Sequence, residues 1–344
     1  MSKNPPITKL LTKASNLKQK DETWEATVRL GRFWITPHRQ PAYRPHITLL
    51  SRPSGAILCS QVQQLQPSPE QTLGQLLKAM CRPAPGAGRP CRPCQIDLDN
   101  PDLVASLAPQ LQTIGIDCQY RSPLAIAQKS LLSLEKQMNR GQDLFPGLLS
   151  ISTVTPPLVQ HLYQLAADFH QVAPWRTLSD LHPIEICHPP TAKPRYAVVM
   201  GSGGEIFGLA VYDSLKDLKR IYNQPFELQP TGPKSSCLMF YFDEAIAMAF
   251  DDLDDAAKYG WPIANETAYP VFARSTPQDT LTTPSAADLF WLEGALEGIL
   301  AYYNHHQEME WGRVKPADLT LPINSLGAKT QLKLRLPAFS PYSD

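Results

Sequence analysis

A glycine-rich stretch, Gly201-Ser202-Gly203-Gly204, has the clearest potential for chemistry in this chain. Glycines that follow an apolar run are typical of loops whose backbone amides hold the phosphates of a nucleotide. A dinucleotide-binding turn has glycine at its first, third and sixth positions and leads directly into a helix. Here Ile206 occupies the sixth position, and residues 205–213 alternate as a strand does. The stretch therefore predicts a hairpin turn between two strands, and no nucleotide site.

Two other groups of residues have types that could hold a metal ion. Cys91 and Cys94 have the spacing of half a zinc site, but structural zinc takes four ligands and no second pair with this spacing follows. The acidic run 251–255 lacks the glycine and the closing glutamate of a calcium loop. Acids at a helix start instead offset the positive end of the helix dipole. We therefore predict no metal and no cofactor, and interpret the acidic run as a solvated helix start.

Composition limits the classes of function that this chain can have. Its 344 residues suit two domains, and the 32 lysines and arginines balance 32 aspartates and glutamates. Because the chain carries no net charge, nucleic acid is a disfavoured partner. The seven cysteines do not indicate a disulfide framework, and no apolar run approaches the ~18 residues that span a bilayer. We expect a soluble, cytoplasmic protein with no membrane partner.

The first half of the chain predicts an α/β domain over residues 24–138. Residues 1–22 are polar and rich in lysine, and we expect a flexible tail there. Residues 24–36 and 44–63 carry strand patterns, and Pro53-Ser54-Gly55 divides the second pattern into a hairpin. Helices are expected over residues 68–80, 100–115 and 122–138, alternating with strands over 94–99 and 116–121. Such alternation predicts parallel pairing, and so a mixed sheet.

The second half predicts an α+β domain over residues 158–310, after a linker over 139–157. We expect an amphipathic helix at its start, the antiparallel hairpin described above, a strand over 236–243 and a long helix over 285–306. Residues 311–344 are expected to form a C-terminal extension with one strand over 329–336.

The element order of residues 44–138 resembles the ribonuclease H-like fold of nucleases, integrases and transposases. In that family, carboxylates on the first strand, the fourth strand and a late helix hold two divalent metal ions for phosphodiester chemistry. The resemblance implies Asp97 or Asp99 on the fourth strand and Glu135 in the late helix. Ser51 occupies the place expected for the first-strand acid, and a serine carries no charge to offset a cation. The alternative is an unrelated α/β sandwich in which Asp97 and Asp99 cap the next helix.

Both domains also resemble bacterial families without an assigned function. Residues 92–120 resemble one built as Arg-Pro, strand, helix, Gly-Ile and strand, and residues 157–305 resemble another with Ala-Pro-Trp and a Met-Gly turn. Neither resemblance implies an activity. The matching side chains with polar or aromatic reach, which are our candidate binding residues, are Trp175, Arg176, Glu205, Phe272 and Arg274.

The function that we expect is therefore non-catalytic binding or scaffolding, with a protein as the class of partner that fits best. A degenerate, metal-dependent enzyme of the ribonuclease H-like type is the alternative. Packing and turn formation are the competing roles for the five candidate binding residues, because tryptophan and phenylalanine are so often part of a core.

Overall fold

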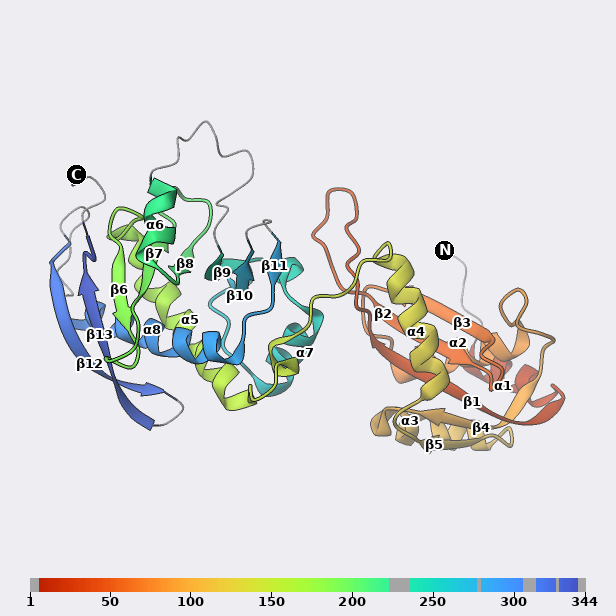
Figure 1. The fold of residues 1–344 in the computed structure, drawn as a ribbon. Coiled ribbons are helices and arrows are strands. Elements are labelled where there is room, and N and C mark those ends of the chain that lie inside the picture. The colour runs from red at the N-terminus through yellow and green to blue at the C-terminus, as the bar shows by residue number, and fades with distance from the viewer. Residues whose placement is uncertain (1–5, 223–235, 277–279, 306–313, 326–327, 340–344) are drawn as a thin grey trace. The chain divides into compact units, whose positions relative to one another are not determined.

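Two sheets form the framework of the chain, one in each of two units, residues 1–143 and 144–344 (Figure 1). The computed structural model describes residues 6–222, 236–276, 280–305, 314–325 and 328–339.

The first unit is a mixed five-stranded sheet with helices on both faces. Its strands are β1 (Gln19–Leu30), β2 (His46–Ser51), β3 (Ile57–Gln63), β4 (Arg92–Leu98) and β5 (Asp117–Tyr120). They lie in the order β3-β2-β1-β4-β5, with β1, β2 and β3 antiparallel and β4 and β5 parallel to β1. The helices are α1 (Ile7–Ser15), α2 (Pro69–Cys81), α3 (Pro101–Gln112) and α4 (Ala125–Met138). The predicted α/β class and the predicted parallel pairing are confirmed.

Local signals in the sequence explain where these helices begin. The side chain of Ser68 accepts a hydrogen bond from the backbone of Gln71, whose own side chain accepts one from the backbone of Ser68, so α2 starts with a capping box. Asn100 caps α3 with a single hydrogen bond, which its side chain accepts from the backbone N–H of Leu103. Helices α1, α2 and α3 pack with β1 around Trp24 on one face of the sheet, and α4 packs on the other.

The expectation of a flexible tail over residues 1–22 is wrong for its described part. Residues 7–15 form α1, and Leu10 and Ala14 are buried against the first core. Their spacing of four places both on one helix face, which the surrounding lysines obscured in the sequence. Strand β1 begins at Gln19, so the first strand of the sheet precedes the region in which the sequence placed it.

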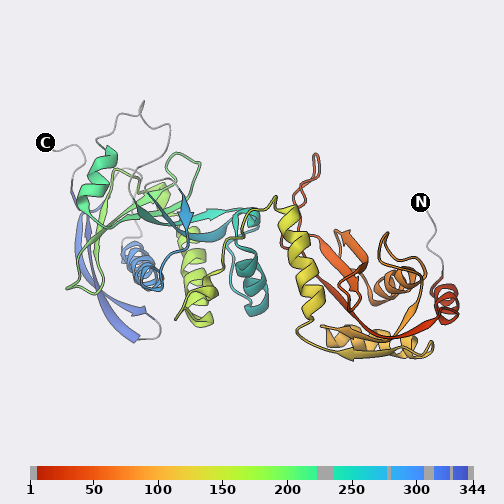
Figure 2. The same cartoon turned by 45° about the vertical axis from the view of Figure 1, so that its right-hand side comes forward.

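The second unit is an eight-stranded antiparallel sheet with helices, which confirms the predicted α+β class. Its strands are β6 (Ile184–Cys187), β7 (Arg195–Met200), β8 (Gly208–Tyr212), β9 (Cys237–Asp243), β10 (Tyr269–Ser275), β11 (Leu281–Thr282), β12 (Ala317–Ser325) and β13 (Ala328–Leu336). They lie in the order β11-β10-β9-β8-β7-β6-β13-β12. The helices are η1 (Leu148–Ser150), α5 (Pro156–Val172), η2 (Pro174–Arg176), α6 (Leu215–Tyr222), η4 (Ala245–Ala247), α7 (Phe250–Tyr259) and α8 (Ala286–His305). Helices α5, α7 and α8 cover one face, and α6 lies on the other (Figure 2).

Parts of the expected linker and of the expected C-terminal extension belong to the second unit. Leu148 and Val154 are buried in its core, although both lie within residues 139–157. Strand β13 pairs with β6 and β12 pairs with β13, so the described residues of the extension complete the sheet. Apolar side chains in both segments find partners that are distant in the sequence, which local periodicity does not show.

The glycine-rich stretch connects β7 to β8, as predicted. The two strands are antiparallel and Met200 lies opposite Gly208. The N–H of Gly204 donates to the carbonyl of Gly201 at 3.0 Å, which closes the turn. Gly201 and Gly204 have φ values of +122° and +81°, a region that favours glycine.

Candidate functional site

The acids that the sequence singled out in the first unit are Asp97 of β4, Asp99 directly after that strand and Glu135 of α4. Glu25 of β1 is the register partner of Asp97 of β4, and Thr27 donates a hydrogen bond from Oγ1 to Asp99 Oδ2 at 2.8 Å. Glu135 lies on α4, which covers this face of β1. Glu25 is thus the acid of β1 next to Asp97, whereas Ser51, which the sequence placed at the first-strand position, ends β2.

Most of these acids already have a partner within the protein. The carboxylate of Asp97 pairs with Arg121 Nε at 3.0 Å, and that of Glu135 pairs with Arg29 Nη2 at 3.0 Å. Glu25 Oε2 accepts two backbone N–H groups at the start of α4, both at 2.8 Å. Among the residues that the structure describes, no three His, Cys, Asp or Glu side chains are placed to hold a metal ion.

The other expectation for Asp97 and Asp99, that they cap the next helix, is also wrong. Asn100 caps α3. Asp97 is 1% exposed and lies within the sheet, where Arg121 and Gln95 bind it. Asp99 binds Thr27 and lines a pocket of about 240 Å³ together with Arg29.

The five candidate binding residues of the second unit do not form one site. Trp175 packs against Phe207, with ring centroids 4.9 Å apart, beneath the turn at Gly201. Phe272 is 4% exposed and stacks on a core phenylalanine of β9. Arg176 and Glu205 are exposed, and their side chains form no hydrogen bond within the described part of the chain. Packing, one of the two roles considered from the sequence, accounts for Trp175.

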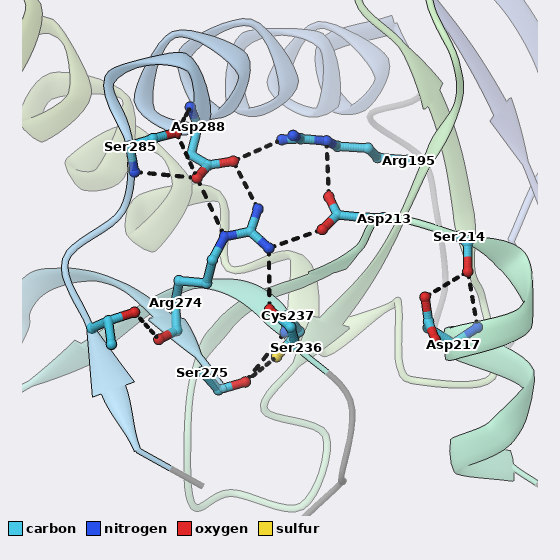
Figure 3. A network of polar contacts seen from close by, with 11 residues as sticks. Arg195, Asp213, Ser214, Asp217, Ser236, Cys237, Arg274, Ser275, Ser285 and Asp288 are labelled. Carbon is cyan, nitrogen blue, oxygen red and sulfur yellow. Dashed lines mark hydrogen bonds and ion pairs between the residues drawn. The ribbon is translucent and has the colours of Figure 1, made fainter. Parts of the chain in front are cut away.

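Arg274 belongs to a charge network at the start of α8 (Figure 3). Its guanidinium binds Asp213 and Asp288, each at 2.8 Å, and Arg195 binds the same two carboxylates at 3.1 and 3.2 Å. Burial would raise the pKa of Asp288, but hydrogen bonds from Arg274 and Ser285 outweigh it and leave this pKa lowered. The two positive and two negative charges of this network balance each other. Because its residues come from β7, the end of β8, β10 and α8, the network links these elements.

Phe272 leads to a pocket in the second unit that the sequence did not predict. The pocket has a volume of about 180 Å³. Its walls are mainly apolar and are formed by Phe145, Tyr241, Ala247, Met248, Ala249, Asp252, Pro270, Val271, Phe272, Ala273 and Leu281. Asp252, in the first turn of α7, is the only charged residue in this set. We refer to it as the Asp252 pocket.

The carboxyl group of Asp252 is in an unusual environment for an acid at a helix start. It is 6% exposed, and its Oδ1 accepts the backbone N–H of Leu148 at 2.7 Å. Burial is the main reason why the pKa of Asp252 is raised to about 7. The hydrogen bond from the backbone of Leu148 lowers this pKa, and the nearby Asp255 and Asp251 contribute to raising it. Interpreting the whole acidic run as solvated is therefore wrong for Asp252.

A second buried polar group lies near this carboxyl. The hydroxyl of Tyr163 has no hydrogen-bond partner within the described ranges of the chain. Burial raises the pKa of Tyr163 well above its usual value, and the charge of Asp252 contributes to that shift. The core behind the pocket therefore has an unsatisfied hydroxyl near an acid that titrates close to neutral pH.

Each unit matches one protein-family model. Residues 10–135 match a domain of unknown function, DUF6930, and residues 160–318 match a second domain of unknown function, DUF7309. The chain carries two domains of unknown function. Comparison with curated proteins finds no match. The DUF6930 match lies within the first unit and the DUF7309 match within the second, and the expected resemblance to two such families is confirmed.

The Asp252 pocket lies in the DUF7309 unit, and all of its lining residues except Phe145 fall inside the family match. The face with Asp97 and Asp99 lies in the DUF6930 unit. No helix within the described ranges combines the length and the apolar character needed to cross a bilayer.

Proposed function

We propose that this chain is a binding protein, and that the Asp252 pocket of the DUF7309 unit holds the ammonium group and apolar body of a small organic cation. The observation that carries this proposal is the lone carboxyl of Asp252 in an apolar wall. A charged carboxylate that leaves water without a counter-ion is costly, so a ligand that brings the opposite charge gains most at such a position.

The surroundings of Asp252 favour a cation over a neutral ligand. Asp251 and Asp255 add negative potential, which an ammonium group offsets. Leu148 occupies one oxygen of the carboxylate, and an ionised carboxylate has further lone pairs to offer. Phe272 and Tyr241 place aromatic rings in the wall, and aromatic rings attract cations as well as apolar groups.

The size of the pocket fits one aromatic or branched aliphatic group. A protein cavity of ~150 Å³ holds a benzene molecule, and the Asp252 pocket is slightly larger, at about 180 Å³. A phenylethylammonium ion combines a group of this size with a cation, and is therefore a suitable probe.

We expect phenylethylammonium to bind the full chain at pH 8, and the Asp252→Asn variant to bind it at least tenfold more weakly. Binding should also weaken between pH 8 and pH 6, because the carboxyl of Asp252 takes up a proton near pH 7 while the amine stays charged. Isothermal titration calorimetry at both pH values measures this. Glu266→Gln, which removes an exposed carboxylate outside the pocket, is the matched control and should bind as the wild type does.

A neutral probe separates charge recognition from simple burial of an apolar group. Phenylethanol has the same ring and chain length but carries no charge. If it binds as tightly as phenylethylammonium, or if Asp252→Asn leaves the affinity for the cation unchanged, the proposal is wrong.

The alternative function, metal-dependent phosphodiester chemistry in the DUF6930 unit, draws support from Glu25, which supplies the acid on the first strand. The strand order β3-β2-β1-β4-β5 also fits the ribonuclease H-like resemblance. Against it stand the partners of the acids, since Arg121 binds Asp97, Arg29 binds Glu135, and the start of α4 binds Glu25. Paired carboxylates must release these partners before they can ligate a cation.

We therefore expect the protein to leave labelled DNA and RNA intact in 10 mM Mg²⁺ or Mn²⁺, as resolved on a denaturing gel. Cleavage by the wild type that is lost in Asp99→Asn would refute this expectation. Cleavage that persists in Asp99→Asn would indicate a contaminating nuclease, and a repeat with more highly purified protein should then show none.

A further inference from the structure

A groove runs along β3 in the DUF6930 unit, between this strand and helices α1 and α2. It consists of two adjoining hollows of about 460 and 470 Å³ that share Leu10, Gln61, Gln75 and Lys78 in their walls. Strand β3 is at the end of the sheet, and β2 is its one partner strand among the residues that the structure describes. We refer to this feature as the β3 groove.

The backbone of β3 directs hydrogen-bonding groups out of the sheet beside the groove. The carbonyl of Leu58 accepts from the N–H of Ala84 at 3.0 Å, whereas Ser60 and Val62 have no such backbone partner in the described part of the chain. The N–H of Gly31 donates to the carbonyl of Pro45 at 2.7 Å, so alternate residues of β2 from Pro45 onward point their backbone groups toward β1. The residues of β2 that alternate with these direct their backbone groups toward β3, where their register partners are Gln63, Gln61 and Cys59. Ser60 and Val62 therefore direct their N–H and C=O groups away from the sheet.

The charges at the β3 groove are mainly positive. Lys13 of α1, together with Lys78 and Arg82 at the end of α2, line its walls, and Glu70 is the one acid among the lining residues. Leu10, Leu58 and Ala79 provide apolar contact area between these polar groups. The groove therefore combines a cationic rim with apolar contacts.

A buried acceptor in the groove also lacks a partner. Gln75 is 8% exposed and donates from Nε2 to Gln63 Oε1 at 3.1 Å. Its Oε1 has no hydrogen-bond partner in the described part of the chain. A buried amide oxygen without a partner costs free energy, which a donor from a ligand would recover.

We propose that the β3 groove binds an extended, acidic peptide segment that adds to the sheet as a strand beside β3. Backbone groups of the peptide pair with Ser60 and Val62, its carboxylates meet Lys13, Lys78 and Arg82, and its apolar side chains contact Leu10 and Leu58. Single-stranded nucleic acid fits less well, because the lining residues include no aromatic ring on which a base could stack. It also lacks the regular N–H and C=O pattern that a strand edge pairs with.

The test uses the full chain and a fluorescein-labelled heptapeptide of alternating glutamate and valine. We expect saturable binding by fluorescence anisotropy, and at least tenfold weaker binding of the counterpart peptide with lysine in place of glutamate. The triple variant Lys13→Glu, Lys78→Glu, Arg82→Glu should reverse this preference. Added salt should weaken the binding, since exposed charges contribute to it.

A proline substitution isolates the contribution of the strand edge. Val62→Pro removes an N–H that points away from β2, so the pairing of β2 with β3 survives while the added strand loses a donor. We expect at least a tenfold loss of affinity for the glutamate peptide. Leu65→Pro, at an exposed position after the strand, is the matched control and should bind like the wild type. Circular dichroism verifies that both variants fold.

Two outcomes would overturn the proposal. One is binding of the glutamate peptide that Val62→Pro leaves unchanged in a folded protein. The other is a preference for labelled oligothymidylate or for the lysine peptide over the glutamate peptide. Asp252→Asn lies in the other unit and should leave peptide binding unchanged. The peptide experiment therefore tests this proposal independently of the proposed function.

Discussion

Replacing Gly208 by alanine should destabilise the DUF7309 unit by more than ~3 kcal/mol, which is among the larger effects of a single substitution. Gly208 has a φ of +156°, and a Cβ there would lie 2.1 Å from the carbonyl oxygen of Phe240 and 2.6 Å from Cα of Tyr241. Both atoms belong to the backbone of β9, so relief of the contact requires β8 and β9 to separate. Urea unfolding of the full chain, followed by tryptophan fluorescence, measures the effect.

Gly203→Ala, in the connection between β7 and β8 that leads to Gly208, provides the matched control. Gly203 does not have a positive φ, and a Cβ there would have no atom within 4 Å. We expect its unfolding curve to stay within ~0.5 kcal/mol of the wild type. Equal destabilisation by the two substitutions would show that the whole glycine-rich stretch, and not the approach of β9 to Gly208, limits the choice of residue here.

The sequence predicts most elements of the fold because their signals are local. Ser68 and Asn100 begin α2 and α3 through hydrogen bonds within three residues of themselves. The glycine turn is predicted correctly because the strands on either side of it are adjacent in the sequence. The sequence does not distinguish Gly203 from Gly208, because the constraint on Gly208 comes from β9, which lies far along the chain.

The elements and site residues that the sequence misses depend on contacts between distant segments. Glu25 becomes the first-strand acid only because β1 pairs with β4, about 70 residues later. Asp252 and Phe272 are both considered from the sequence, but Asp252 is interpreted as part of a solvated acidic run and Phe272 as one of five candidate binding residues. Their common pocket exists because β10 lies next to α7 in the folded unit. Nothing in the residues around Asp252 reveals that it is buried.

A partly buried ion pair between α5 and α8 is the basis of the second large effect that we expect. His161 Nδ1 lies 2.6 Å from Glu293 Oε1, and the side chain of Glu293 is fully buried. The hydroxyl of Ser325 donates to the other oxygen of Glu293 at 2.5 Å. Neither His161 nor Glu293 stood out in the sequence, because helical spacing alone does not show that α5 and α8 pack together.

His161→Ala should destabilise the DUF7309 unit by about 3 kcal/mol at pH 6, since it removes the imidazolium that pairs with the buried carboxylate of Glu293. We take the lower end of the usual range because the His161 side chain is 34% exposed. The double variant His161→Ala, Glu293→Gln also removes the buried charge of Glu293 and should recover part of the loss. If the double variant is no more stable than His161→Ala, lost packing and not charge explains the effect.

The contribution of this pair should also depend on pH with a definite sign. The hydrogen bond from His161 to Glu293 raises the pKa of His161 despite the opposing effect of burial. A folded pKa above the unfolded value of ~6.5 means that the folded state binds the proton more tightly, so the stabilisation is complete below ~6.5 and is lost as the pH rises through the folded pKa. The difference in unfolding free energy between the wild type and His161→Ala should therefore shrink from pH 6 to pH 9. Asp252 titrates in both proteins and cancels in this difference. A difference that stays constant over that range would mean that His161 is not charged in the folded protein, and that its contact with Glu293 is a hydrogen bond between a neutral imidazole and a protonated acid.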